Sequence, residues 1–207
     1  MAKHTRQDLL ERGVGMLLRH GYHDLGLAAL LEAGDIPKGS FYHHFASKED
    51  FALQAIDLYM VEVHAGLDHF LGDTSLPPLR RVRRFFEATI EKYRGEGYLG
   101  CLLGGLGQEL SGVSEVFRRK VEQCFGEIAL RLGSCLDEAV RVGELPKGTD
   151  THRLAELLVD AWEGAALRTR LCRDARPLRE MLDFWLRGAD ARPPAAKARR
   201  RTPNKRA

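Results

Sequence analysis

The amino-acid sequence predicts an all-α protein. Apolar residues recur at intervals of three and four along most of its 207 residues, a spacing that places them on one face of an α-helix. No segment sustains the alternation of apolar and polar residues that marks a half-buried strand. The glycine-rich run at 100–112 does not follow a strand, so it lacks the setting of a dinucleotide-binding loop. We therefore expect a fold built from helices alone.

The composition excludes several classes of protein. With 44% hydrophobic and 29% charged residues, the chain has the profile of a globular protein. It has no apolar stretch long enough to cross a membrane, and its start lacks the apolar core of a signal peptide; we expect a cytoplasmic protein without a membrane partner. Its four cysteines show no C-x-x-C spacing, which favours free thiols over disulfides or a zinc site. We expect no metal and no cofactor.

Net charge alone does not identify a nucleic-acid-binding surface. The formal net charge is +3, but residues 191–207 contribute seven basic and no acidic side chains, so the rest of the chain is net acidic. This segment is interrupted by prolines and lacks apolar periodicity, which predicts a disordered basic tail. It is either a solubilising tail or an auxiliary arm that binds phosphate.

Three helices are predicted within residues 1–46. The first begins at Thr5, with Asp8 three residues later as a capping partner, and stops near Gly21. A second, short helix ends at the turn formed by residues 33–35, and a third begins at Pro37, which suits the first turn of a helix. Helix, tight turn and helix is the order found in a helix-turn-helix. Residues 1–46 are therefore predicted to be a DNA-binding domain.

The third helix and the start of the next one supply the predicted DNA contacts. Phe41 and Phe45 are four residues apart and should anchor one side of the third helix in a core, which directs its other side outward. Ser47 is a capping residue for the following helix and places Lys48 in its first turn, where a helix N-terminus attracts phosphate. The predicted contacts are Lys38, Gly39, Ser40, Tyr42, His43 and Lys48, with Lys38 and Ser40 assigned to bases and Lys48 to the DNA backbone.

Residues 47–190 are predicted to form a second helical domain, which binds a ligand and dimerises. Apolar stripes and helix-stop residues divide it into six helices. These helices run from Lys48 to about Phe70, from Pro77 to Gly95, from Cys101 to about residue 112, from Ser114 to Gly143, and over residues 150–170 and 176–187.

The helix that begins at Cys101 has an unusual composition. Gly104, Gly105 and Gly107 lie inside it, and each interior glycine costs about 1 kcal/mol relative to alanine. Such a run indicates either close helix packing or space left for a ligand. At the start of a helix, the positive end of the helix dipole would lower the pKa of the Cys101 thiol and favour the thiolate. A buried, unreactive cysteine is the alternative.

The DNA-binding segment resembles a known family. Residues 8–52, which include Gly21-Tyr22 and the run KGSFYHHF-x-x-K, resemble the DNA-binding domain of the TetR family of bacterial transcription regulators. The resemblance implies an N-terminal three-helix helix-turn-helix domain and a C-terminal helical domain that binds ligand.

Two segments of the second domain resemble a subgroup of that family. The run GCLLGGLGQEL, including Gly107-Gln108-Glu109, is similar to regulators that respond to acrylate, and also to those that respond to other electrophiles. In these relatives a cysteine at the Cys101 position is implicated in sensing. Trp162, Glu163 and Arg168 in DAWEGAALRTRL also resemble the acrylate-type regulators, which tend to have Lys where this chain has Arg170. The predicted ligand-binding residues are Cys101, Gly105, Gln108, Trp162 and Arg168.

The two C-terminal helices predict a homodimer. Their apolar faces are larger than one small helical bundle can bury. Pairing the two helices with their copies across a two-fold axis would give a four-helix interface. The predicted interface residues are Leu158, Ala165, Leu182 and Trp185. A dimer can read a palindromic operator through two recognition helices.

We therefore expect a ligand-responsive transcriptional repressor that a small, acrylate-like or electrophilic inducer releases from double-stranded DNA. The inducer would either add covalently to Cys101 or bind reversibly, with Arg168 holding its carboxylate; we favour reversible binding. Two other classes remain open, a thiol-dependent enzyme that uses Cys101 and a non-specific DNA-binding protein that uses its basic tail. Five of the eight histidines lie in residues 1–50, and no Cys/His/Asp set can be assigned elsewhere, which argues against the enzyme.

Overall fold

The computed structural model describes residues 6–26, 28, 31–32 and 38–190, and every regular element among them is an α-helix. The all-α prediction is confirmed. No helix formed by these residues is both long enough and apolar enough to span a membrane. The predicted tail at 191–207, the turn at 33–35 and the capping residue Thr5 lie outside the described residues.

The N-terminal helices begin and end close to the predicted positions. Helix α1 (Arg6–His20) is followed by Gly21, whose φ of +74° is a conformation that glycine adopts without strain. Helix α3 (Lys38–His44) precedes α4 (Lys48–Leu71). The Ser47 side chain accepts a hydrogen bond of 3.0 Å from the Asp50 backbone N–H, as expected of a residue that caps α4.

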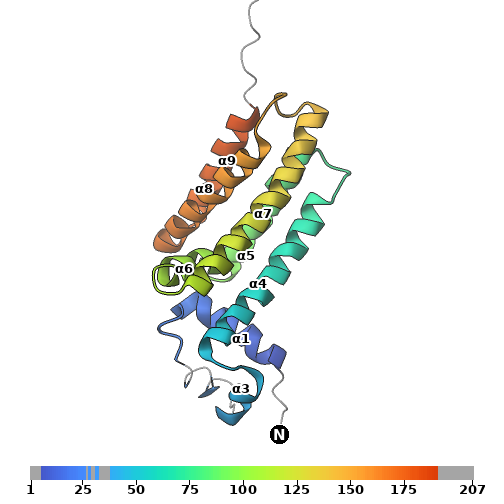
Figure 1. Cartoon of the computed structure of the whole chain (residues 1–207). Coiled ribbons are helices and arrows are strands. Elements are labelled where there is room, and N and C mark those ends of the chain that lie inside the picture. Colours follow the sequence, from blue (N-terminus) through green and yellow to red (C-terminus); the bar gives the residue numbers. More distant parts are fainter. Residues whose placement is uncertain (1–5, 27, 29–30, 33–37, 191–207) are drawn as a thin grey trace, which may run out of the picture.

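Five further helices complete the described chain, and their caps also follow the sequence signals. The Ser114 side chain caps α7, the Asp150 side chain caps α8, and Gly143 ends α7 in a left-handed conformation. Figure 1 shows α4, α5, α7, α8 and α9 as an elongated bundle above α1 and α3, with the short α6 between the two parts. The five helices are α5 (Pro78–Gly95), α6 (Leu102–Leu110), α7 (Glu115–Val142), α8 (Thr151–Cys172) and α9 (Arg176–Asp190).

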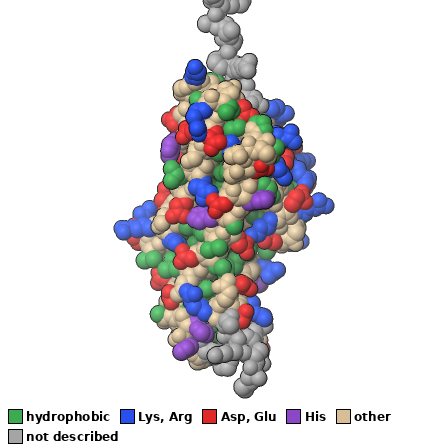
Figure 2. Space-filling model, turned by 90° about the vertical axis from the view of Figure 1, so that its right-hand side faces the viewer, with side chains coloured by type: hydrophobic (Ala, Val, Ile, Leu, Met, Phe, Trp, Pro, Cys, Tyr) green, Lys and Arg blue, Asp and Glu red, His purple; other side chains and the backbone are tan. Residues whose placement is uncertain are grey.

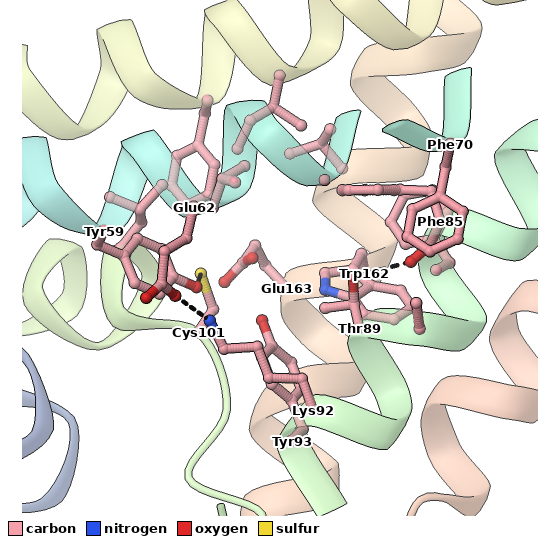
Figure 3. A pocket seen from close by; sticks show the side chains of 18 residues that line it. Tyr59, Glu62, Phe70, Phe85, Thr89, Lys92, Tyr93, Cys101, Trp162 and Glu163 are labelled. Carbon is pink, nitrogen blue, oxygen red and sulfur yellow. Dashed lines mark hydrogen bonds and ion pairs between the residues drawn. The ribbon is translucent and has the colours of Figure 1, made fainter. Parts of the chain in front are cut away.

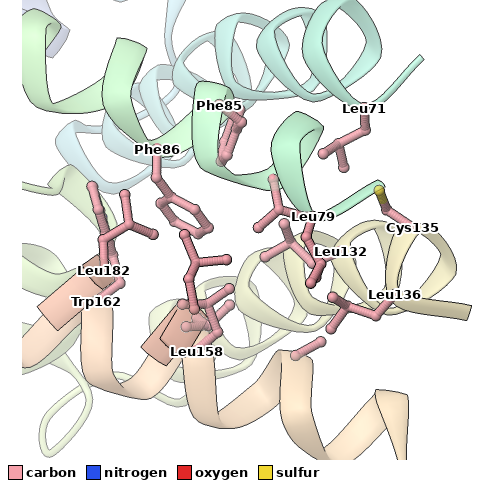
Figure 4. Close-up of a cluster of buried hydrophobic side chains, with 14 of the residues drawn as sticks. Leu71, Leu79, Phe85, Phe86, Leu132, Cys135, Leu136, Leu158, Trp162 and Leu182 are labelled. Carbon is pink, nitrogen blue, oxygen red and sulfur yellow. The ribbon is translucent and has the colours of Figure 1, made fainter. Parts of the chain in front are cut away.

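Two hydrophobic clusters fill the molecule, and α4 belongs to both. Phe51 and Ile56, in its first half, lie in the lower cluster with α1 and α3, whereas Leu67 and Leu71 lie in the upper cluster with α5, α7, α8 and α9. Figure 4 shows the upper cluster, in which the rings of Phe86 and Trp162 are 4.5 Å apart. The buried leucines of α6 belong to the lower cluster (Leu102, Leu103, Leu106 and Leu110). Helix α6 therefore packs with the helices of the predicted DNA-binding segment.

The upper cluster corrects the predicted subunit interface. Leu158, Ala165 and Leu182 are 0%, 8% and 2% exposed in the single chain, and Trp185 packs partly buried against the same cluster. Side chains that are already buried within one chain have almost no surface left to bury against a second. The apolar periodicity of α8 and α9 thus identified an intramolecular core face.

The contact between α1 and α4 generates a stability prediction. A Cβ on Gly13 of α1 would collide with the ring of Phe51, which is fully buried in the lower cluster. Gly13→Ala should therefore lower the free energy of unfolding by about 1–3 kcal/mol, as overpacking of a core does. Gly15→Ala is a matched control, because this position on the same helix has only the end of the Arg19 side chain nearby. It should raise the free energy of unfolding by up to about 1 kcal/mol. Urea unfolding of both variants measures the difference, and equal effects would contradict the packing described.

Candidate functional site

The predicted DNA-binding end, which comprises α3 and the start of α4, is held by a cluster of aromatic rings. Phe41 of α3 and Phe45, which directly follows α3, pack against Phe51 of α4, with ring centroids 5.0–5.4 Å apart. This anchor leaves the opposite side of α3 in solvent, where Tyr42 is 52% exposed and His43 is exposed. Figure 2 shows histidine side chains at the end of the molecule where Figure 1 has α3.

The other predicted DNA contacts have different settings. Gly39 is exposed on α3, with nothing within 4 Å of a Cβ built on it. Lys38 and Ser40 belong to α3, but their side chains lie outside the described part of the chain. Lys48 is half-buried; its Nζ lies 4.6 Å from the centroid of the Tyr22 ring and donates a 3.4 Å hydrogen bond to the backbone oxygen of His23. Lys48 is thus positioned by the segment that follows α1.

The same segment is bonded to the far end of α6. Glu109 accepts hydrogen bonds from the backbone N–H groups of Tyr22, at 2.7 Å, and His23, at 2.5 Å. A Cβ at Gly21 would lie only 2.6 Å from the Glu109 carboxylate, so glycine permits this close approach as well as the positive φ. Hydrogen bonds from N–H groups to a carboxylate are among the stronger ones in proteins. Glu109 therefore ties α6 to the segment that positions Lys48.

The opposite end of α6 borders a mostly apolar cavity of about 190 Å³. The cavity lies where the two hydrophobic clusters meet, because Val63 and Cys101 contact both. Its volume is similar to that of cavities that hold one aromatic ring. Figure 3 shows the side chains around it. Those that lie on α4 and α5 include Tyr59, Glu62, Phe70, Phe85, Phe86, Thr89, Lys92 and Tyr93, and those from later elements include Cys101, Phe125, Trp162 and Glu163.

Polar groups are concentrated at one end of this cavity. Trp162 hydrogen bonds to Tyr93, and Tyr93 to Tyr59. The Tyr59 hydroxyl donates to the sulfur of Cys101 at 3.8 Å, and the Cys101 thiol hydrogen bonds to Glu163. In Figure 3 the Glu163 carboxylate points toward this sulfur. The Glu163 carboxylate is therefore the acceptor at the end of a series of neutral donors.

Burial controls the protonation of this pair. Withdrawal from water raises the pKa of Glu163 to about 7, and the hydrogen bond from Cys101 offsets only part of this rise. Burial, followed by the negative charge of Glu163, raises the pKa of the Cys101 thiol well above its usual range. This corrects the expectation of a thiolate at Cys101, because desolvation and the nearby carboxylate outweigh the dipole of a nine-residue helix. Cys101 is thus a neutral thiol, which is also unlike the nucleophile of a thiol enzyme.

The glycines of α6 fit around this carboxylate. A Cβ on Gly104 would collide with Glu163 Oε2, whereas one on Gly105 would meet nothing within 4 Å. Gly104 therefore permits a close approach to α8, and Gly105 faces open space. A Cβ on Gly107 would make only an ordinary contact with Val121 of α7. Of the two uses predicted for these glycines, close packing applies to Gly104.

The predicted ligand-binding residues do not all line one cavity. Cys101 and Trp162 line the apolar cavity, and Gly105 and Gln108 line a second hollow of about 330 Å³ between α1, α6 and α8. Cys101 and Glu163 border both, and Arg170 borders only the second. Arg168 is exposed and lines neither, which corrects its assignment as a clamp for a ligand carboxylate. The neighbouring turns of α8 direct Trp162 and Glu163 inward and Arg168 outward.

Comparison with known proteins identifies the family. Residues 9–55 match the family model of bacterial regulatory proteins of the tetR family, and residues 78–185 match that of the tetracyclin repressor-like C-terminal domain. The chain belongs to the TetR family. This TetR protein is 34% identical to the HTH-type transcriptional repressor DhaR of Mycobacterium sp. (strain GP1), over 86% of this chain and 88% of DhaR.

Two further comparisons agree. The chain is 37% identical to the transcriptional regulator AcuR of Cereibacter sphaeroides, over 81% of this chain and 77% of AcuR. The crystal structure of a regulatory protein TetR from Rhodobacter sphaeroides superposes with a TM-score of 0.85 at 35% identity, covering 89% of this chain and 98% of that one. The protein is a TetR-family transcriptional repressor.

Several cavity residues were missed by sequence reasoning. Tyr59 and Tyr93 fall on the apolar faces of α4 and α5, a pattern that indicates burial but no site, and Glu163 is singled out in the sequence only by its resemblance to relatives. The signal available was the hydroxyl of each tyrosine, which must find a hydrogen-bond partner when the side chain is buried. Which partner it finds depends on how α4, α5 and α8 pack, and no local pattern encodes that.

The Glu109 contact can be tested by hydrogen exchange. Replacing Glu109 with alanine leaves the N–H groups of Tyr22 and His23 without their acceptor. A hydrogen bond to a charged group contributes about 1.5–3 kcal/mol, so exchange at these two amides should become roughly tenfold to hundredfold faster. The control is Glu122→Ala, an exposed position on α7. Exchange is measured by NMR. If Glu109→Ala leaves the exchange rates of the Tyr22 and His23 amides unchanged, this carboxylate does not join α6 to the segment after α1.

Proposed function

We propose that this repressor binds a palindromic operator as a homodimer and dissociates from it when a small molecule enters the apolar cavity. The observation that carries the proposal is the position of α6. At the start of α6, Cys101 lines the cavity, and Gly104 packs against Glu163, which also lines it. At its last turn, Glu109 holds the backbone of Tyr22 and His23. One short helix thus connects the cavity with the predicted DNA-binding end.

The way in which a ligand would act follows from this connection. A molecule in the cavity displaces the side chains at the start of α6, and a helix of nine residues, about 13 Å long, transmits a shift without bending. Glu109 then moves Tyr22 and His23, which position Lys48. A ligand that binds the shifted arrangement more tightly than the operator-binding arrangement lowers the affinity for the operator. The decrease is limited by the ratio of the ligand's affinities for these two arrangements.

The homodimer is supported by apolar surface on α8 and α9. Leu171 and Phe184 are 67% and 76% exposed, and Leu157 and Leu167 are also exposed. Ala161 and Gly164 are exposed on α8 and are small enough to let a second helix approach closely. Pairing these faces across a two-fold axis would bury them and separate two α3 helices at a fixed distance. This face replaces the interface residues predicted from sequence.

The proposal assigns no chemical turnover to the protein. A partly buried neutral thiol at Cys101, with no histidine among the described residues that line the apolar cavity, supports binding rather than nucleophilic catalysis. Non-specific DNA binding through the basic tail is the weaker alternative, because α3 is anchored in a defined orientation by Phe41 and Phe45. The site of action would be the operator DNA in the cytoplasm.

The DNA contact of Lys48 is the first test of this function. Lys48→Ala should weaken operator binding and reduce the slope of log K against log salt by about 0.9, the contribution of one phosphate contact. Lys147→Ala is the control, because this exposed lysine lies in the connection between α7 and α8 at the other end of the bundle. Binding to an operator fragment from the DNA beside the gene is measured by fluorescence anisotropy at several salt concentrations. An unchanged slope in Lys48→Ala would rule out this contact.

The dimer face gives a second test. Phe184→Arg should convert the dimer to monomers and abolish high-affinity operator binding, because it places an unpaired charge in the proposed interface. The control is Val61→Arg, which alters a similarly exposed apolar residue (63%) on α4, away from α8 and α9. Analytical ultracentrifugation reports the oligomeric state. A Phe184→Arg protein that sediments as a tight dimer would place the interface on another surface.

A further inference from the structure

The apolar cavity contains one carboxylate that no cation balances. Its charged lining residues are Glu62, Lys92 and Glu163. Lys92 pairs with two carboxylates, that of Glu62 at 2.5 Å and that of Glu96 at 4.0 Å. Within the described part of the chain, Glu163 forms no ion pair and has the Cys101 thiol as its hydrogen-bond donor. The lining therefore has a net negative charge when Glu163 is ionised.

Aromatic rings form much of the rest of the cavity wall. Five of these rings follow one another in space, those of Phe70, Phe85, Phe86, Trp162 and Tyr93. Successive centroids are 4.5–6.5 Å apart and the ring planes are inclined by 44–71°, so the rings face in several directions instead of stacking in one. Figure 3 shows Glu163 between the Cys101 sulfur and the Trp162 ring. The unbalanced carboxylate thus lies at the edge of an aromatic wall.

Aromatic faces and a carboxylate attract the same kind of ligand. The face of an aromatic ring carries partial negative charge and attracts a cation that lies within about 6 Å of its centroid. The cavity wall already contains such a contact, because the Lys92 Nζ lies 5.6 Å from the centroid of the Tyr59 ring. An anion would instead meet the Glu163 carboxylate away from water, where like charges repel strongly. The wall therefore favours a cation.

The hydrogen-bonding groups of the wall narrow the class of cation. A primary ammonium group brings three N–H donors, and each needs an acceptor once it is withdrawn from water. Apart from carboxylates, the side-chain oxygens of the described lining are the hydroxyls of Tyr59, Thr89 and Tyr93, and each already takes part in a hydrogen bond. A quaternary ammonium group has no N–H to satisfy. A cavity of about 190 Å³ is large enough for a trimethylammonium group with a short arm.

We propose that the apolar cavity binds a small quaternary ammonium ion, with Glu163 as its counter-ion and the aromatic rings around its methyl groups. This inference rests on the proposed function, because it names the chemical class of molecule that acts through the cavity. It differs from the acrylate-like inducer that the sequence resemblance implies. That expectation required a cation for the ligand carboxylate, and Arg168 lines neither the cavity nor the second hollow.

The counter-ion role also gives ligand binding a route to α6. The Glu163 carboxylate lies where a Cβ on Gly104 would be, and it is hydrogen bonded to Cys101 at the start of the helix. A cation in the cavity competes with the thiol for this carboxylate and draws it toward the aromatic rings. The contact between α8 and the start of α6 then changes, which is the displacement that the proposed function requires.

Three compounds of similar shape and different charge test the inference. Choline carries a quaternary ammonium group, 3,3-dimethylbutan-1-ol has carbon in place of that nitrogen, and 3,3-dimethylbutanoate is an anion. Isothermal titration calorimetry on the intact protein without DNA measures the affinity for each compound at pH 8. Burial raises the pKa of Glu163 to about 7, so its carboxylate is ionised at this pH.

The expected result is a preference for choline that depends on Glu163. The parent protein should bind choline at least about tenfold more tightly than the alcohol, and the anion more weakly than the alcohol. In Glu163→Gln, a replacement of nearly the same shape, the preference for choline should disappear while the affinity for the alcohol stays the same, which shows that the cavity persists. Glu156→Gln is the matched control and should keep the full preference, because this exposed residue of α8 does not line the apolar cavity.

Four results would overturn the inference: a parent protein that binds no choline, equal affinities for choline and the alcohol, tightest binding of the anion, or an undiminished preference for choline in Glu163→Gln. The first three need only the parent protein, so they do not depend on the folding of a variant.

Release from the operator is measured separately, by fluorescence anisotropy. Choline that binds with the expected preference but leaves the operator complex intact would contradict ligand-driven release, and the inference about the cavity would stand. Release by the anion alone would support the proposed function and overturn the inference.

Discussion

The described structure depends on two carboxylates that hold the short helix α6 at its two ends. Glu163 lies against Gly104 near the start of α6, and Glu109, in its last turn, lies against Gly21 and accepts two backbone hydrogen bonds. In both places the carboxylate occupies the volume that a Cβ would need, so both close contacts require glycine. Because one carboxylate belongs to the cavity and the other reaches the predicted DNA-binding segment, α6 is a physical connection between them.

Burial gives these two carboxylates different chemical characters. The Glu109 carboxylate accepts hydrogen bonds from the backbone N–H groups of Tyr22 and His23, in the segment that follows α1. Glu163 has the Cys101 thiol as its donor and lies in an apolar setting, so its pKa rises to about 7. The first carboxylate joins α6 to the segment after α1 through two hydrogen bonds, whereas the second changes charge near neutral pH.

Helix α4 explains how the two parts of the molecule can respond together. Its first half is packed with α1 and α3, its second half with α5 and α7, and the cavity lies where these clusters meet. Closely packed cores transmit small displacements because they contain little free volume. A predicted boundary at residue 46 separates the chain by motif, but the buried leucines of α6 and Phe117 of α7 pack in the lower cluster with the DNA-binding helices. The proposed domain boundary thus separates two sequence motifs, but the lower hydrophobic cluster extends across it.

The sequence by itself determined the helices and predicted the DNA-binding end. Serine and aspartate caps, left-handed glycines and apolar spacing are local signals, and they placed Ser47, Gly143 and Asp150 where the structure has them. Tertiary structure decided the rest. The pKa of Cys101, the outward direction of Arg168 and the burial of Leu158 and Leu182 all depend on which helices surround each side chain. A helical stripe shows that a face is buried without showing against what, and a helix dipole predicts a lowered thiol pKa only where no desolvated carboxylate lies beside it.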